Sequence, residues 1–277
     1  MATEAGVAAR EPWWQALAEA WARLRGVPLD PLGRPLPRAR VRRHDGFVSL
    51  QFVRGQTQSR MRGNAPEHLL IDYTRTMLGV LLWNPRPARV GIVGLGGGSQ
   101  VKFLHRHLAG TRLEVVENHP GVIAVRREFG IPDDDARLEV VLDDGARFVA
   151  TRPGRFDLLL VDGYDARGIP ASLATVEFHR ACRAALAPGG ALASNLHGDQ
   201  PAPHVERLRE AFGEGRVRVV EEPRMNNRVV FAWVGDAPGD GALDAACNAL
   251  SAEGARELRP ALARVARELA RPDPWTP

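Results

Sequence analysis

The sequence predicts an α/β fold, a doubly wound and mostly parallel sheet with helices on both faces, preceded by a small β-hairpin domain. Three observations support this prediction. From residue 89 onward, apolar runs of strand length alternate with amphipathic stretches of helix length, which is typical of a parallel sheet covered on both faces. The first apolar run, 89–93, ends directly in a glycine-rich turn at 94–98. Ahead of it, residues 41–54 alternate polar and apolar side chains around the turn His44-Asp45-Gly46, as a hairpin does.

The segments before the sheet follow from apolar periodicity and proline content. Residues 11–25 have the spacing of an amphipathic helix, and the prolines of 27–37 exclude regular helix and indicate a linker. The hairpin of 41–54 continues through 55–61 toward the main domain. Pro66 begins a long apolar-periodic helix, which leads into the first strand of the sheet.

The alternating region contains five strands and five helices. Strands are expected at 89–93, 112–116, 137–142, 156–161 and 190–195, and helices at 99–109, 119–129, 144–151, 175–186 and 202–213. Two further strands, 217–220 and 228–234, are joined by a short connection through Asn226-Asn227, which favours an antiparallel hairpin at the sheet edge. Residues 240–270 are expected to form one or two surface helices.

These elements divide the chain into four parts. An N-terminal helix with its Pro-rich linker occupies 1–37, and a small β-domain occupies 38–65. The α/β domain occupies 66–240, and a C-terminal helical tail follows at 241–277.

Composition narrows the class of protein. The content of hydrophobic residues, 44%, is enough for a large core, and the two cysteines form no disulfide framework or metal-ligand spacing. The net charge is +4, but the arginines are interspersed with acids, so neither nucleic acid nor a membrane surface is expected as a partner. No stretch approaches the ~20 apolar residues of a membrane span, and no secretory signal pattern is visible, so a cytoplasmic location is expected.

The glycine-rich turn and the end of the second strand form a candidate nucleotide site. Gly94, Gly96, Gly97 and Gly98 let the backbone turn sharply and approach a ligand, whose polar atoms can bind the free N–H groups at the next helix start. Glu117 follows the second strand, where a carboxylate can accept hydrogen bonds from ribose hydroxyls. The pattern therefore indicates an adenosine-containing ligand.

Carboxylates also follow the third and fourth strands. Asp143 and Asp144 with Gly145 follow the third strand, and Asp162 and Asp165 follow the fourth. Each acid alone could be a helix cap or a turn former. Because ligands of open α/β sheets bind at the carboxyl ends of the strands, the acids together predict one shared crevice. No zinc, P-loop or serine-hydrolase signature is present, and no metal site is expected.

Four motifs carry a resemblance to a known family. They are Gly94-Leu95-Gly96-Gly97-Gly98, then Glu117, then Asp143-Asp144-Gly145-Ala146-Arg147-Phe148, and Val161-Asp162-Gly163-Tyr164-Asp165 followed by Gly168-Ile169-Pro170 and Glu177-Phe178. With these motifs the chain, from Gly55 to Val234, resembles the spermidine synthase (polyamine aminopropyltransferase) family. The resemblance implies a small N-terminal β-domain, a Rossmann-like domain of the class I methyltransferase type, and a homodimer. It also implies transfer of an aminopropyl group from decarboxylated S-adenosylmethionine to a polyamine acceptor.

The resemblance also implies roles for individual residues. Glu117 would hold the ribose hydroxyls, and Asp144 would accept from the adenine amino group. Asp162 would face the attacking amine, and Asp165 would help to hold the cationic chain. Gln58 matches a family glutamine near the donor. The donor would be a co-substrate, so no permanently bound cofactor is expected.

Two positions depart from the family pattern. Gly97 stands where the family usually has an aspartate that faces the donor's amine, so S-adenosylmethionine with its carboxylate is a second candidate donor. The region 66–73 shows no clear counterpart of the Tyr-His or Tyr-Gln pair found before the glycine strand. Three alternatives therefore stay open: an S-adenosylmethionine-dependent methyltransferase, a nicotinamide-dependent dehydrogenase, and a catalytically silent relative that binds a nucleoside or a partner subunit.

Overall fold

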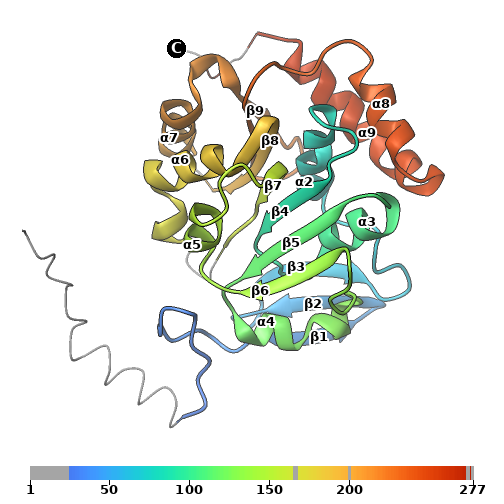
Figure 1. Ribbon diagram of the computed structural model, residues 1–277. Coiled ribbons are helices and arrows are strands. Elements are labelled where there is room, and N and C mark those ends of the chain that lie inside the picture. Colours follow the sequence, from blue (N-terminus) through green and yellow to red (C-terminus); the bar gives the residue numbers. More distant parts are fainter. Residues whose placement is uncertain (1–24, 165–167, 199–200, 273–274, 276–277) are drawn as a thin grey trace, which may run out of the picture.

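The computed structural model describes residues 25–164, 168–198, 201–272 and 275 (Figure 1). The helix expected over 11–25 lies outside this part of the chain except for its last residue. Asp165 also lies outside the described residues.

The main sheet has seven strands in the order β6-β5-β4-β7-β8-β10-β9. The strands are β4 (Arg89–Val93), β5 (Arg112–Glu117), β6 (Leu138–Leu142), β7 (Phe156–Val161), β8 (Leu186–His197), β9 (Val217–Glu221) and β10 (Asn227–Trp233). The first five of this order pair in parallel, whereas β10 is antiparallel to both β8 and β9. The predicted mostly parallel sheet is confirmed, and so is the antiparallel hairpin at its edge.

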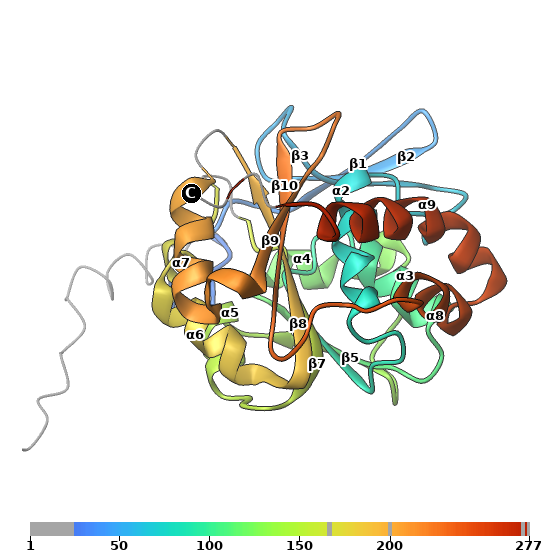
Figure 2. The ribbon, with the colours of Figure 1, turned by 90° about the horizontal axis from the view of Figure 1, so that it is seen from above.

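Helices cover both faces of this sheet (Figure 2). The described α-helices are α2 (Asp72–Met77), α3 (Ser99–His107), α4 (Pro120–Ala124), α5 (Gly145–Ala150), α6 (Val176–Ala185), α7 (Ala202–Phe212), α8 (Ala242–Ala249) and α9 (Ala252–Leu269). One face carries α2, α3, α8 and α9, and the other carries α5, α6 and α7. Successive strand residues such as Ile92 and Val93 belong to two separate core clusters, one on each face, because strand side chains alternate. None of the described helices has the length and apolar character needed to cross a membrane.

The N-terminal domain is a three-stranded antiparallel sheet of β1 (Arg40–His44), β2 (Phe47–Gln51) and β3 (Thr57–Arg62). The sequence predicted the hairpin of the first two strands, and the third was expected only as a continuation. Leu50 and Met61 are buried in the same core cluster as α2 and α3, which attaches the small sheet to the α/β domain. Three strands with one packed face are independently more stable than a lone hairpin.

Two helices are shorter than predicted. The helix expected from Pro66 begins only at Asp72 and continues as the 3-10 helix η1 (Leu78–Leu82). Glu257 of α9 accepts a hydrogen bond from the Leu69 N–H (2.7 Å) and pairs with His68 (3.0 Å), which anchors the preceding segment outside a helix. Similarly, the stretch 119–129 divides into α4 and the 3-10 helix η2 (Arg126–Phe129).

The C-terminal segment is more deeply packed than surface helices would be. The amphipathic helix α9 buries Leu258, Leu262 and Val265 in the core cluster beside η1. Gly79 of η1 faces Val265 so closely that a Cβ would lie 2.9 Å from its Cγ2. The tail is therefore an integral layer of the α/β domain. The remaining short 3-10 helices are η3 (Ala171–Leu173) and η4 (Glu214–Arg216).

A buried histidine on α6 predicts acid sensitivity. Burial lowers the pKa of His179 to about 4, and its Nε2 has no hydrogen-bond partner among the described residues. The unfolded chain binds this proton near pH 6.5, so the stabilising contribution of the neutral ring is lost as pH falls from 6.5 toward 4. We expect a loss of up to about 3 kcal/mol in unfolding free energy over this range. Urea titrations of His179→Leu should show a smaller loss than wild type, and equal losses would contradict the assignment.

Candidate active site

A cavity of about 590 Å3 opens at the carboxyl ends of β4, β5 and β7, beneath β2 and β3. The chain leaves β4 toward β5 and β6 on one side and later returns to β7 and β8 on the other. The cavity therefore lies at the topological switch point, where open α/β sheets bind their ligands. Its volume is that of a small-molecule site.

Glu117 ends β5 and organises the glycine turn. Its carboxylate accepts hydrogen bonds from the N–H groups of Leu95 (2.9 Å) and His119 (2.8 Å). Burial raises the pKa of Glu117, and these backbone donors act in the opposite direction. One carboxylate thus fixes the loop and still borders the cavity, where lone pairs of its oxygens can accept ligand hydroxyls.

Gly94 shows why the turn requires glycine. Its φ is +95°, and a Cβ there would lie 2.3 Å from the carbonyl oxygen of Asp162. The close approach brings the residue after β7 directly against the glycine turn. Gly96, Gly97 and Gly98 also line the cavity.

Of the two acids after β6, Asp144 lies on the cavity wall and Asp143 does not. Asp144 lines the cavity and caps α5 by accepting from the N–H groups of Ala146 (3.0 Å) and Arg147 (3.1 Å). The same side chain therefore caps the helix and borders the cavity. Gly145 is also on the cavity wall. Asp143 is not, because its carboxylate turns to the guanidinium of Arg147 (2.7 Å).

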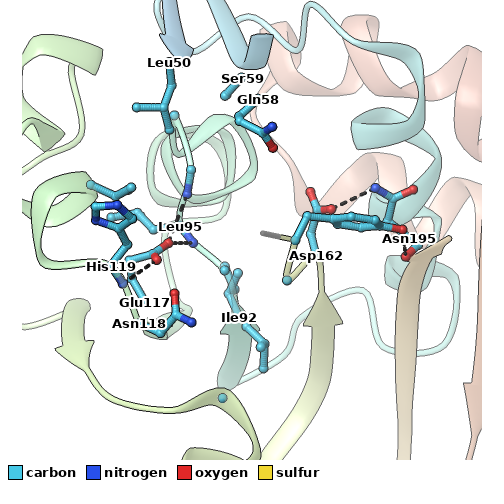
Figure 3. Close-up of a pocket in the computed structure, with 18 of the residues that line it drawn as sticks. Leu50, Gln58, Ser59, Ile92, Leu95, Glu117, Asn118, His119, Asp162 and Asn195 are labelled. Atoms are coloured by element: carbon cyan, nitrogen blue, oxygen red, sulfur yellow. Dashed lines mark hydrogen bonds between the residues drawn. The ribbon is translucent and has the colours of Figure 1, made fainter. Parts of the chain in front are cut away.

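Asp162 lies across the cavity from Glu117, as Figure 3 shows. Its Oδ2 accepts from the Tyr73 hydroxyl (3.0 Å), and its Oδ1 accepts from the Asn195 side-chain amide (2.8 Å). Burial raises the pKa of Asp162, while the two hydrogen bonds partly offset the increase. The carboxylate is thus held in one orientation and is a stronger base than a solvated aspartate.

Asn227 and Tyr164 support this arrangement from behind. The Asn227 amide donates to the side-chain oxygen of Asn195 (2.9 Å), which leaves the Asn195 amide nitrogen to donate to Asp162. The Tyr164 hydroxyl donates to the main-chain carbonyl of Asn195 (2.9 Å) and accepts from the main-chain N–H of His197 (2.6 Å). His197 itself lines the cavity.

The small N-terminal sheet supplies the remaining wall. Gln58 and Ser59 lie on β3 at the cavity (Figure 3). Phe52, just after β2, stacks on His119 with ring centroids 5.0 Å apart. His119 is also within hydrogen-bond distance of the Pro37 carbonyl (2.6 Å), so the Pro-rich linker borders the same cavity.

The cavity collects most of the residues that sequence reasoning selected. On its wall are Gln58, Gly94, Gly96, Gly97, Gly98, Glu117, Asp144, Gly145 and Asp162. Sequence reasoning missed Tyr73, Asn195 and Asn227. Tyr73 lies in the stretch for which the sequence predicted a long apolar-periodic helix from Pro66, and its hydroxyl reaches Asp162 instead of the core. In the part of the chain that is described, no group of three or more potential metal ligands occurs.

Comparison with known proteins agrees with this architecture. Residues 72–206 match the model of the spermine/spermidine synthase domain. A polyamine aminopropyltransferase of Chromobacterium violaceum is 34% identical over 73% of this chain and 78% of its own length. A probable spermidine synthase of Corynebacterium glutamicum has a similar fold, with a TM-score of 0.61, 20% identity, and coverage of 76% of this chain and 82% of its own. A spermidine synthase solved with the transition-state analogue AdoDATO has a TM-score of 0.59 at 18% identity, and the match covers 89% of this chain and 91% of that one.

The sheet order and the cavity at its switch point define a Rossmann-like protein of the methyltransferase fold with a small-molecule site. Within that class, the chain belongs to the spermine/spermidine synthase family, the polyamine aminopropyltransferases. The predicted family and enzyme class are thus confirmed. The homologues support aminopropyl transfer, and no finding favours the methyltransferase, dehydrogenase or silent alternatives.

Proposed function

We propose that the protein transfers the aminopropyl group of decarboxylated S-adenosylmethionine to a primary amine of a polyamine. The observation that carries this proposal is the pair of carboxylates on opposite sides of one cavity. Glu117 borders the side of the glycine turn, and Asp162 is held by Tyr73 and Asn195 on the other side. The first suits ribose hydroxyls and the second suits an amine.

The donor side would be built from the glycine turn and its neighbours. Gly94, Gly96, Gly97 and Gly98 would approach the sulfonium and the sugar, and Glu117 would accept from the ribose hydroxyls. Asp144 and Gly145 would face the adenine. Asp143 would not contact the donor directly, since its carboxylate accepts from the guanidinium of Arg147. An adenosyl-based co-substrate also agrees with the AdoDATO complex of the related spermidine synthase.

The reaction is a displacement at carbon. The amine lone pair attacks the carbon bonded to the sulfonium, the carbon–sulfur bond breaks, and its electron pair stays on sulfur, giving a neutral thioether. Positive charge thereby moves from sulfur to nitrogen. The Asp162 carboxylate orients the amine and stabilises the ammonium as it develops, and its raised pKa assists proton removal. Asp165 would hold a second ammonium of the acceptor.

We propose a homodimer in the cytoplasm, acting on small-molecule amines, with neither nucleic acid nor membrane as a partner. We also propose the organisation into 1–37, 38–65, 66–240 and 241–277, in which α9 packs into the core of the α/β domain.

Single-turnover assays test the proposed function. The enzyme is mixed with decarboxylated S-adenosylmethionine and one member of a panel of diamines and triamines, and the alkylated amine is identified by mass spectrometry. The expected product is the acceptor enlarged by one aminopropyl group, with one thioether nucleoside released per transfer. Transfer of a methyl group alone would contradict the proposal.

The hydrogen bond from Tyr73 to Asp162 gives a separate prediction. Tyr73→Phe removes a donor that lowers the pKa of Asp162, so that pKa should rise further. The acid limb of the pH–rate profile should shift upward, and turnover at neutral pH should fall by about tenfold, as expected for loss of a hydrogen bond to a charged group. An unshifted acid limb would show that the contact does not act on Asp162 in the working enzyme.

A further inference from the structure

Two buried asparagine amides connect Asp162 to the antiparallel part of the sheet. Asn195 lies on β8 and Asn227 on β10, and each residue has only 5% of its surface exposed. In the register of these paired strands Asn195 is opposite Val229, two residues along β10 from Asn227. Residues two apart on a strand point to the same face, so the main chain holds the two amides side by side.

The hydrogen bonds of the two amides run in one direction, toward Asp162. Asn227 donates to the side-chain oxygen of Asn195 (2.9 Å), and the Asn195 amide nitrogen donates to Oδ1 of Asp162 (2.8 Å). An amide carries its acceptor and its donors on opposite sides, so the contact with Asn227 decides which of them Asn195 presents to Asp162. While Asn227 donates, a reversed Asn195 would set two donors against each other at one contact and two acceptors against each other at the next. Unpaired buried groups of this kind are costly, and this cost fixes the orientation of Asn195.

Asp162 depends on these donors because little else near it favours the carboxylate. Burial raises its pKa, and the hydrogen bonds from Asn195 and Tyr73 are the contacts that lower it. The described residues of the cavity wall include no lysine or arginine. The titratable groups on that wall, besides Asp162 itself, are Tyr73 of α2, Glu117 and His119 at the end of β5, Asp144 before α5, Tyr164 after β7 and His197 at the end of β8. None of them carries a fixed positive charge, so no cation on the described wall compensates for a lost donor.

We infer that Asn227 is a positioning residue for the reaction: by donating to Asn195, it keeps an N–H of that amide on Asp162 and so holds the carboxylate ready for the amine. The inference rests on the proposed function, in which Asp162 orients the attacking amine. Asn227 acts through Asn195, across two neighbouring strands, and no bond of the substrates is made or broken by it.

The substitution Asn227→Asp reverses the chain of hydrogen bonds and keeps the shape of the side chain. A carboxylate accepts and does not donate, so Asn195 should turn its amide to donate to the new side chain and present its oxygen to Asp162. The acid limb of the pH–rate profile should then move up by about one pH unit, and transfer at neutral pH should fall by about tenfold or more. Asn227→Leu ends the donation without reversing it and should shift the acid limb in the same direction by less. Donor affinity, measured by calorimetry, should stay near the wild-type value in both variants.

Two comparisons separate the hydrogen bond from the charge that the substitution adds. In an Asn195→Leu background no amide joins positions 162 and 227, so Asn227→Asp can act on Asp162 only through space. Its shift of the acid limb should there be less than about half of the shift in the wild-type background. Asn226→Asp adds the same charge to the neighbouring residue, which is exposed and outside the cavity wall, and should transfer like wild type.

The possible outcomes distinguish the positioning role from the proposed function. An unshifted acid limb in folded Asn227→Asp, or equal shifts in the two backgrounds, would overturn the inference and leave the proposed function standing. If Asn227→Asp does not fold, an unshifted acid limb in Asn227→Leu would overturn the inference in its place. Wild-type protein that transfers no aminopropyl group would overturn both.

Discussion

Replacing Asp162 by asparagine should lower the rate of aminopropyl transfer by ~10²–10³-fold and leave donor affinity nearly unchanged. The amide keeps the shape of the carboxylate but lacks the negative charge that stabilises the developing ammonium. Its oxygen can still accept from Asn195, and its nitrogen can donate to the Tyr73 hydroxyl if that hydroxyl rotates. The local fold should therefore persist. Single-turnover rates and calorimetric donor affinities measure the two effects separately.

The same substitution should raise stability at neutral pH. Burial raises the pKa of Asp162 in the folded protein, so ionisation of this carboxyl costs stability as pH rises through the folded pKa. The neutral amide avoids that cost. Asp162→Asn should thus melt at a higher temperature than wild type near pH 8, and the difference should shrink as pH falls toward the unfolded value of ~3.9. If Asp162→Asn shows the expected loss of rate but melts at a lower temperature than wild type, the substitution has introduced a packing defect. Transfer at the wild-type rate would contradict the proposed mechanism.

The fold was predictable where burial alone determines the pattern. Strands 89–93 and 156–161 have the predicted bounds, because a strand buried on both faces is a continuous apolar run. The third strand of the N-terminal sheet was less visible. In Thr57–Arg62 only Met61 is buried, so the segment lacks the alternation that identifies a strand. The late start of α2 depends on Glu257, nearly two hundred residues away, and such a contact leaves no local signal.

The candidate site was predictable to the extent that it follows strand ends. Glu117 ends β5, Asp144 is the second residue after β6, and Asp162 comes directly after β7. Parallel strands bring these carboxyl ends to one edge of the sheet. The residues that orient Asp162 could not be found in this way. Tyr73 has the spacing of a core residue on a helix, and Asn227 belongs to the antiparallel strand beside β8. Their hydroxyl and amide reach the site only through tertiary pairing.

Removing the Glu117 side chain should weaken the binding of a thioether nucleoside by about tenfold to a hundredfold. Glu117→Ala leaves the ribose hydroxyls without their acceptor, and an unpaired buried polar group costs about 1–3 kcal/mol. It also removes the acceptor for the N–H groups of Leu95 and His119, so the glycine turn loses part of its order. Calorimetry with methylthioadenosine measures the total effect. Glu139→Ala, on the neighbouring strand and outside the cavity wall, is the matched control and should bind like wild type.

The direct contribution of Glu117 can be separated from its effect on the turn by changing the ligand. Wild type should bind 2′-deoxymethylthioadenosine several-fold more weakly than methylthioadenosine, because one hydroxyl that donates to the carboxylate is gone. Glu117→Ala should bind the two nucleosides equally, since the partner of that hydroxyl is already absent. Each protein gives one ratio, its affinity for methylthioadenosine divided by its affinity for the 2′-deoxy form. The two ratios, converted to free energies and subtracted, give the coupling energy between the carboxylate and the hydroxyl, in which the disorder that the substitution introduces cancels. If the variant keeps the full preference of wild type for the ribose form, Glu117 shapes the turn but does not touch the sugar.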